Sequence, residues 1–201
     1  TADSTLTLTG TSSFGGIIQN ALGSGTRTTA LTVNGGALTL TAANTYTGAT
    51  TISAGSLVLT GVGALSASTP LNLSGATAVF NPSGITAGSL TVASLAGVVG
   101  SSVNLGAKTL VAGGDNTSGT FAGVLSGTGG AFTKAGDGNL TLNGANTYTG
   151  ATLVSRGTLT TAAGSLAATS GIAVNGAALV AVNYNATATL ALNSTGTATI
   201  S

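Results

Sequence analysis

The chain has 201 residues, of which only four are basic and three acidic, and its net charge is +1. It contains no His, Glu, Cys, Met or Trp, which excludes Ser-His-Asp and Cys-His catalysis and leaves few metal ligands. So few basic groups give no basis for binding nucleic acid.

Short segments in which apolar residues alternate with Thr, Asn or Ser recur along the chain. In chain order they are TLTLT at 5–9, ALTLTA at 37–42, SLVLT at 56–60, NLTLN at 139–143, TLTT at 158–161 and TLALN at 189–193. This period of two is typical of strands with one buried face. Clusters rich in Gly, Asn and Asp separate them and predict turns. We therefore predict an all-β chain with almost no helix and no transmembrane segment.

One octapeptide, ANTYTGAT, occurs at 43–50 and again at 145–152. The similarity extends further, because residues 35–61 align with residues 137–163 without a gap. Upstream, 13–25 resembles 120–130 at an offset that differs by five residues. A long internal repeat of this kind predicts architecture before it predicts chemistry. We expect a single domain over 1–201 made of two related modules, about 1–105 and 106–201.

A shorter spacing lies inside each module. Leu38 and Leu57 are separated by the same interval as Leu140 and Leu159. The interval is close to one coil of a β-solenoid, in which the chain returns to stack in parallel on its previous coil. The spacing predicts a parallel β-helix of about ten coils of roughly 20 residues each, with the octapeptides about five coils apart.

Within this solenoid the octapeptide is predicted to be a turn that ends one strand and starts the next. The residues expected to build it are Asn44, Tyr46, Gly48, Asn146, Tyr148 and Gly150. The asparagines favour turn conformations or bonds to their own backbone, and the glycines permit positive φ. The tyrosines are expected to cover the edge of the coil. A binding role for the two tyrosines is the alternative.

The residues around the octapeptides resemble a known family. LTLTAANTYTGATTISAGSLVL at 38–59 and LTLNGANTYTGATLVSRGTL at 140–159 are similar to the passenger-associated repeat of bacterial autotransporters, and FTKAGDGNLTL at 132–142 resembles the segment that precedes it. The resemblance implies a right-handed parallel β-helix, exported to the bacterial surface or beyond, usually within a longer protein. The preference for right-handed crossovers independently favours the same hand.

Asp115 and Asp137 are the acidic residues that could act together. Their separation along the chain is close to one coil, so neighbouring coils could bring them to one side. A catalytic pair or a calcium site is therefore conceivable, although two carboxylates are few for calcium. Both lie in Gly/Asn turns, where Asp is expected for local reasons. We expect a turn role, no enzyme activity and no cofactor.

The two ends of the chain also look like strands. TLTLTG at the start includes Leu6 and Leu8, and TGTATIS at the finish includes Thr197 and Ile200. Open strand edges invite pairing, so we expect these residues to join copies end to end or to continue into a longer passenger. The first ten residues lack the pattern of a secretion signal, which we expect to be absent or already removed.

The sequence thus predicts a non-enzymatic structural protein of the bacterial cell surface or extracellular matrix, either a passenger segment or a fibre subunit. Two rival hypotheses remain. One is an adhesin that binds host glycans or surfaces through the tyrosines. The other is ice binding through Thr-x-Thr pairs, which occur at 5–9, 39–41, 45–47, 147–149, 158–160, 187–189 and 195–199. These pairs do not recur at one position of every coil.

Overall fold

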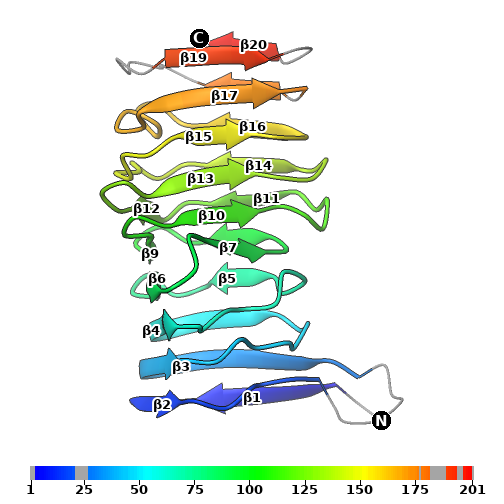
Figure 1. Ribbon diagram of the computed structural model, residues 1–201, viewed down its shortest axis with the longest axis vertical. Helices are drawn as coiled ribbons and strands as arrows, with labels where there is room; N and C mark the ends of the chain where they lie inside the picture. The colour runs from blue at the N-terminus through cyan, green and yellow to red at the C-terminus, as the bar shows by residue number, and fades with distance from the viewer. Residues whose placement is uncertain (1–2, 21–26, 177, 182–188, 194–196, 201) are drawn as a thin grey trace.

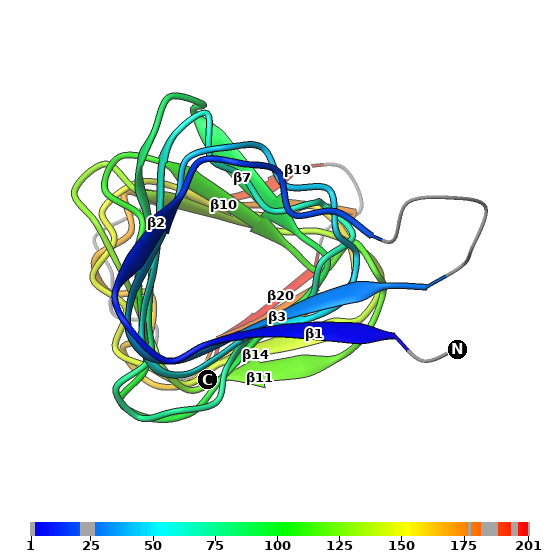
Figure 2. The same cartoon turned by 90° about the horizontal axis from the view of Figure 1, so that it is seen from below.

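The computed structural model describes residues 3–20, 27–176, 178–181, 189–193 and 197–200. The chain winds into a stack of coils with a triangular cross-section, β1 at one end of the long axis and β20 at the other (Figures 1 and 2). Seen from the N-terminal end, it runs clockwise as it recedes, so the solenoid is right-handed (Figure 2). Within these ranges no helix has the length and apolar character needed to cross a membrane.

Three flat faces form the sides of the prism, and every strand pairing is parallel. The first face contains β1 (Ser4–Leu8), the first parts of β3 (Thr29–Leu40) and β4 (Thr50–Gly61), β5 (Leu71–Leu73), β8 (Leu95–Gly97), β11 (Gly119–Phe121), β14 (Asn139–Leu142), β16 (Thr158–Thr161), β18 (Ala178–Ala181) and β20 (Thr197–Ile200). The second contains β2 (Ser12–Phe14), the later parts of β3 and β4, β6 (Val79–Ile85), β9 (Ser102–Asn104) and β12 (Val124–Ser126). The third contains β7 (Ser89–Val92), β10 (Thr109–Ala112), β13 (Ala131–Lys134), β15 (Thr152–Val154), β17 (Gly171–Asn175) and β19 (Thr189–Asn193).

The spacing of the leucines correctly predicted the coil. Leu38 pairs directly with Leu57, and Leu140 with Leu159. Other coils are longer, however, such as the one that brings Ala30 next to Thr5. Because many coils exceed the interval between the paired leucines, the number of turns is slightly smaller than the predicted ten.

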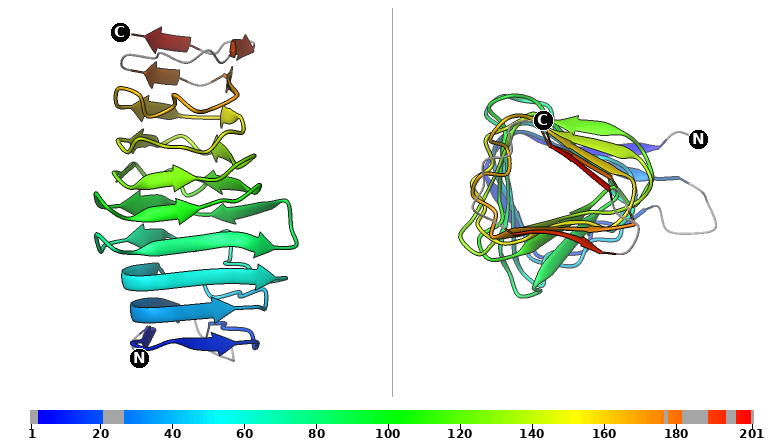
Figure 3. Two further views of the ribbon diagram at one scale, coloured as in Figure 1. Left: turned by 90° about the vertical axis from the view of Figure 1, so that its left-hand side faces the viewer. Right: turned by 90° about the horizontal axis from the view of Figure 1, so that it is seen from above.

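Apolar side chains stack in columns inside the prism. On the second face Leu38, Leu57, Phe80, Val103 and Leu125 occupy paired positions on successive coils, and each is at most 1% exposed. The alternation of leucine with threonine explains this arrangement, because every second side chain points inward. The view from the C-terminal end shows the strands of successive coils lying over one another around the closed interior (Figure 3).

A translation along the long axis of the solenoid does not superimpose the two modules, because aligned residues lie on different faces. Residues 37–40, before the first octapeptide, lie on the second face, whereas the aligned residues 139–142 lie on the first face. Residues 50–52, which begin with the last residue of the first octapeptide, lie on the first face, whereas the aligned residues 152–154 lie on the third. The second module is therefore rotated by one face of the triangle.

Candidate functional site

Each octapeptide forms an irregular side of its coil instead of a tight turn at an edge. The first copy spans the third side between β3 and β4, stacked between Ile18 of the preceding coil and Ala64 of the following one. The second copy spans the second side between β14 and β15, next to Leu125 and Ser165. The same eight-residue sequence therefore forms the third side of the prism in the first copy and the second side in the second copy. Each copy connects two strands across the side that lies between them.

The asparagines of the octapeptides join three successive coils. The Asn44 side chain accepts from the Ile18 amide at 2.9 Å and donates to the Ala64 carbonyl at 2.9 Å. Asn146 accepts from the Leu125 amide at 2.8 Å and donates to the Ser165 carbonyl at 2.9 Å. Both residues are buried. A side-chain amide thus takes the place of a peptide group in the ladder, which satisfies backbone groups that the irregular side leaves unpaired.

The tyrosines fill the core. Tyr46 is 0% exposed and Tyr148 1% exposed, so the expectation that they cover an edge is wrong. Their hydroxyls lie 2.6 Å from Thr50 Oγ1 and 2.5 Å from Thr152 Oγ1, respectively. A side without a regular strand leaves space that a large ring fills, and the buried hydroxyl is satisfied by the threonine four residues later. Rings in this position do not form an adhesive surface.

The two glycines of the motif are required because neither position has room for a side chain. Neither Gly48 nor Gly150 has a positive φ, contrary to expectation. A Cβ atom at Gly48 would lie 2.4 Å from the Thr29 carbonyl oxygen, and one at Gly150 would lie 2.5 Å from that of Gly130. The amide nitrogens of both glycines donate to these same carbonyls, at 3.0 and 2.7 Å. A side chain would push adjacent coils apart and break these bonds.

Alkaline pH is expected to destabilise the fold through the two tyrosines. Burial raises the pKa of Tyr46 from 10.0 to about 12 and raises the pKa of Tyr148 further. The unfolded chain loses these protons near pH 10 while the folded chain keeps them, so stability is full below pH 10 and falls as pH rises toward 12. Tyrosinate absorbance of a Tyr184→Phe variant, which removes the third tyrosine, measures this. Titration of both groups near pH 10 without unfolding would contradict the burial.

Ser165→Ala is expected to stabilise the protein by about 1 kcal/mol. The Ser165 hydroxyl is buried and has no hydrogen-bond partner among the described residues. At the corresponding place in the first copy, the carbonyl that receives the asparagine belongs to Ala64. Denaturant unfolding measures the change, and the reverse substitution Ala64→Ser is the matched test. A loss of stability in Ser165→Ala would show that the hydroxyl is satisfied.

The two acidic turn residues do not form a shared site. The Asp115 carboxylate accepts from the amide and hydroxyl of Thr117 at 3.1 and 2.8 Å. The Asp137 carboxylate pairs with the Arg156 guanidinium through two bonds of 2.8 and 2.9 Å. No group of three or more potential metal-binding side chains occurs in the described part of the chain. Each carboxylate is thus engaged separately.

The predicted assembly residues lie at opposite ends of the first face. Leu6 is 43% exposed, Leu8 is half-buried against the core, and Thr197 is exposed. The backbone of Ile200 pairs with Ala181, while its side chain lies outside the described residues. The same face carries outward threonines in paired positions at 7, 32 and 51 and again at 120, 141 and 160, with Asn72 and Ala96 between the two runs. This alignment was not visible in the sequence.

Comparison with known proteins identifies the repeated segments. The family model of the passenger-associated-transport-repeat matches residues 33–59 and 132–160. No curated protein and no solved structure matches the chain significantly. Each matched segment contains a Leu-Thr-Leu strand, an octapeptide side and strand residues that follow it. The chain therefore carries two copies of the passenger-associated-transport-repeat, each closing one coil of a right-handed β-solenoid.

Proposed function

We propose that the chain is a non-enzymatic rod segment of a protein exported to the bacterial cell surface or the extracellular matrix. The observation that carries this proposal is that both copies of the passenger repeat are built into one continuous solenoid. Their polar and aromatic side chains are used for joining coils and filling the core. A backbone ladder along the whole axis suits a protein whose task is to span distance.

Immunogold labelling of intact cells that produce the protein tests this location. Antibodies raised against the purified chain are expected to label the cell surface or the surrounding matrix without permeabilisation. Labelling that appears only after permeabilisation would contradict export. Antibodies against a cytoplasmic protein of the same cells serve as the control for intact membranes.

The finer form of the proposal is that copies join end to end. The N-terminal coil leaves a cavity of about 420 Å³, lined mainly by Leu6, Leu8, Phe14, Ile17, Leu38 and Leu40. Leu6 is 43% exposed although its partner Leu31 is 0% exposed, and Leu192 is 50% exposed although its partner Val174 is 0% exposed. The outermost strands of the first face, β1 and β20, run in the same direction. A second copy that stacks β20 on β1 would cover apolar groups at both ends and pair open strand edges.

Sedimentation and negative-stain microscopy at increasing protein concentration test the assembly. The unmodified protein is expected to form longer rods, and Leu6→Asp, which places a charge inside the junction, is expected to abolish them. Thr7→Asp is the matched control, because its side chain lies on the outer surface of the same strand. A monomer at all concentrations would refute end-to-end assembly while leaving the rod segment intact.

A further inference from the structure

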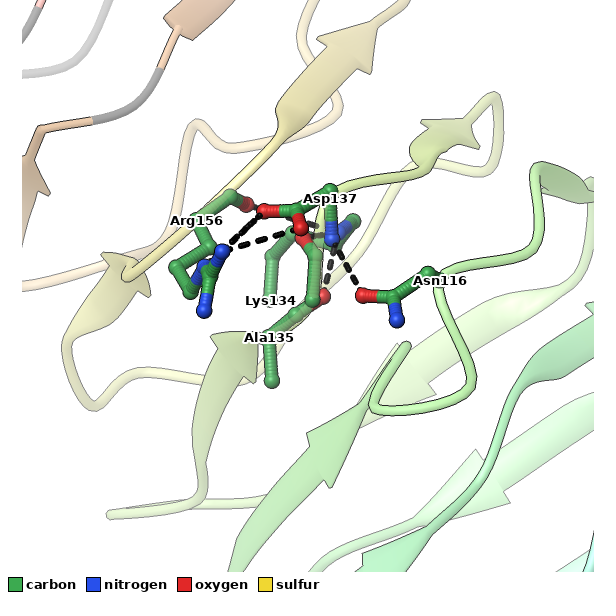
Figure 4. Close-up of polar contacts among 6 residues, drawn as sticks. Asn116, Lys134, Ala135, Asp137 and Arg156 are labelled. Atoms are coloured by element: carbon green, nitrogen blue, oxygen red, sulfur yellow. Dashed lines mark hydrogen bonds and ion pairs between the residues drawn. The ribbon is translucent and has the colours of Figure 1, made fainter.

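Charge is concentrated at one corner of the prism. Of the seven charged residues, four lie in the turns that lead from the third face to the first on three successive coils, or immediately before them. They are Asp115, Lys134, Asp137 and Arg156, and Figure 4 shows the last three together with Asn116. These turns connect β10 to β11, β13 to β14 and β15 to β16. Such clustering in a nearly uncharged chain indicates a specific local role.

Lys134 occupies an inward position. It pairs with Ala112 on the preceding coil and Val154 on the following one, and all three residues are 0% exposed. Within the described ranges it is the one charged residue that is buried. An unpaired ammonium in this place would be strongly unfavourable, so its hydrogen-bond partners determine whether the fold tolerates it.

Backbone carbonyls supply those partners. Lys134 Nζ donates to the carbonyl oxygen of Ala135, to that of Gly136 at 2.8 Å and to that of Arg156 at 3.4 Å. An ammonium has three N–H donors, and three acceptors from two coils receive them. We call these three carbonyls the carbonyl cage. The arrangement resembles the way backbone oxygens replace the water around a cation.

Glycines make the cage possible. Gly136 has a φ of +64° and Gly113, on the preceding coil, a φ of +103°. A Cβ atom at Gly113 would lie 3.2 Å from Lys134 Nζ and 2.5 Å from the Ala135 carbonyl oxygen. The corner therefore needs left-handed backbone and a missing side chain to bring carbonyls and ammonium together.

The charges around the cage are balanced. Burial lowers the pKa of the Lys134 ammonium, while the nearby Asp137 and Asp115 carboxylates act in the opposite direction. Asp137 is also held by Arg156, and its amide donates to Asn116 Oδ1 at 2.8 Å. The two carboxylates therefore offset the two cations across three coils.

The first module has a neutral equivalent of this corner, which lies between the first and second faces because the modules are rotated by one face. There the last inward residue before the turn is Val33, and Ser53 on the next coil donates to the Val33 carbonyl and to Asn34 Oδ1, both at 3.2 Å. A solenoid corner of this kind thus forms without a buried cation. Lys134 is an additional element of the second module.

We propose that this corner is a binding site for a primary ammonium group, made by backbone carbonyls and filled by the Lys134 side chain as a tethered ligand. The cage recognises three N–H donors carried by one positive charge. It should therefore accept a free alkylammonium ion when the lysine side chain is cut back.

The test is rescue of Lys134→Ala by n-propylammonium, which replaces the atoms from Cγ to Nζ that the substitution removes. The thermal midpoint of this variant is expected to rise saturably by about 2–4 °C with n-propylammonium. Neither 1-propanol, which has the same shape without the charge, nor tetramethylammonium, which has no N–H donor, should raise it. If the variant does not fold alone, refolding in n-propylammonium but not in 1-propanol is the expected result.

Two further variants serve as controls. Lys108→Ala removes a lysine outside the cage and should show no response to n-propylammonium. Lys134→Met fills the space of the lysine side chain as far as Cε and leaves no room for the ion, so it should not be rescued. An equal response to 1-propanol, an equal response of Lys108→Ala, or no response of Lys134→Ala to any of the solutes would overturn the proposal.

Discussion

Replacing Asn146 by alanine is expected to lower the free energy of unfolding by about 2–4 kcal/mol. The substitution removes the bonds from the Leu125 amide at 2.8 Å and to the Ser165 carbonyl at 2.9 Å, which lie on the two neighbouring coils. Each of these backbone groups is left without its side-chain partner in the interior. A buried group that loses its partner carries its full desolvation penalty, which exceeds the net value of an ordinary hydrogen bond.

Urea unfolding of Asn146→Ala measures this loss, with Asn143→Ala as the matched control. Asn143 lies three residues earlier, is exposed, and makes no side-chain bond within the described structure. Its replacement should change stability by less than about 0.5 kcal/mol. Equal effects of the two substitutions would show that the asparagine of the octapeptide does not join coils. Asn44→Ala should reproduce the loss in the first copy, because it breaks the bond from Ile18.

The tyrosines provide the second large effect. Tyr148→Ala is expected to cost about 3–5 kcal/mol, because the ring is fully enclosed and its removal leaves a large cavity. Phe14→Ala is the control for loss of an aromatic ring, since that side chain is 44% exposed and should cost much less. A small loss from Tyr148→Ala would mean that the ring lies at the surface, as the sequence alone suggested.

Removing only the hydroxyls should distinguish the two copies. In Tyr46→Phe the buried Thr50 hydroxyl loses its described partner, at an expected cost of about 1–3 kcal/mol. In Tyr148→Phe the Thr152 hydroxyl keeps Thr169 at 3.2 Å, so the cost should be smaller. Thermal or urea unfolding of the two variants measures the difference, and the reverse order would contradict these hydroxyl contacts.

The local strand pattern was sufficient to predict the fold class. Alternation of leucine and threonine set the inward and outward faces, and the shared interval between the leucines identified directly paired positions. The number of turns was overestimated because that interval came from the two repeat coils. Coils between them, such as that from Leu71 to Leu95, contain insertions at the corners and are longer.

The roles of the octapeptide residues were harder to predict. Asn146 accepts from the Leu125 amide and donates to the Ser165 carbonyl, and backbone donors and acceptors carry no sequence signature. The buried tyrosines had one sequence signal, a threonine four residues later in both copies, but that pattern is also expected of a surface strand. One weak sequence signal preceded the rotation of the second module: the offset between 13–25 and 120–130 differs by five residues from the offset between 35–61 and 137–163. No sequence signal indicated that Lys134 is buried, because a single lysine in a strand is normally exposed.

One copy of the repeat closes one coil, and a disulfide between Thr141→Cys and Thr160→Cys tests this arrangement most directly. These residues are paired across β14 and β16 with the octapeptide between them, and parallel neighbours lie within disulfide reach. The chain has no native cysteine to interfere. We predict rapid intramolecular cross-linking on mild oxidation, and none for Thr133→Cys with Thr141→Cys, which are closer in sequence but lie on different faces. Failure of the 141–160 pair to cross-link in folded protein, or equal cross-linking of the 133–141 pair, would contradict the solenoid.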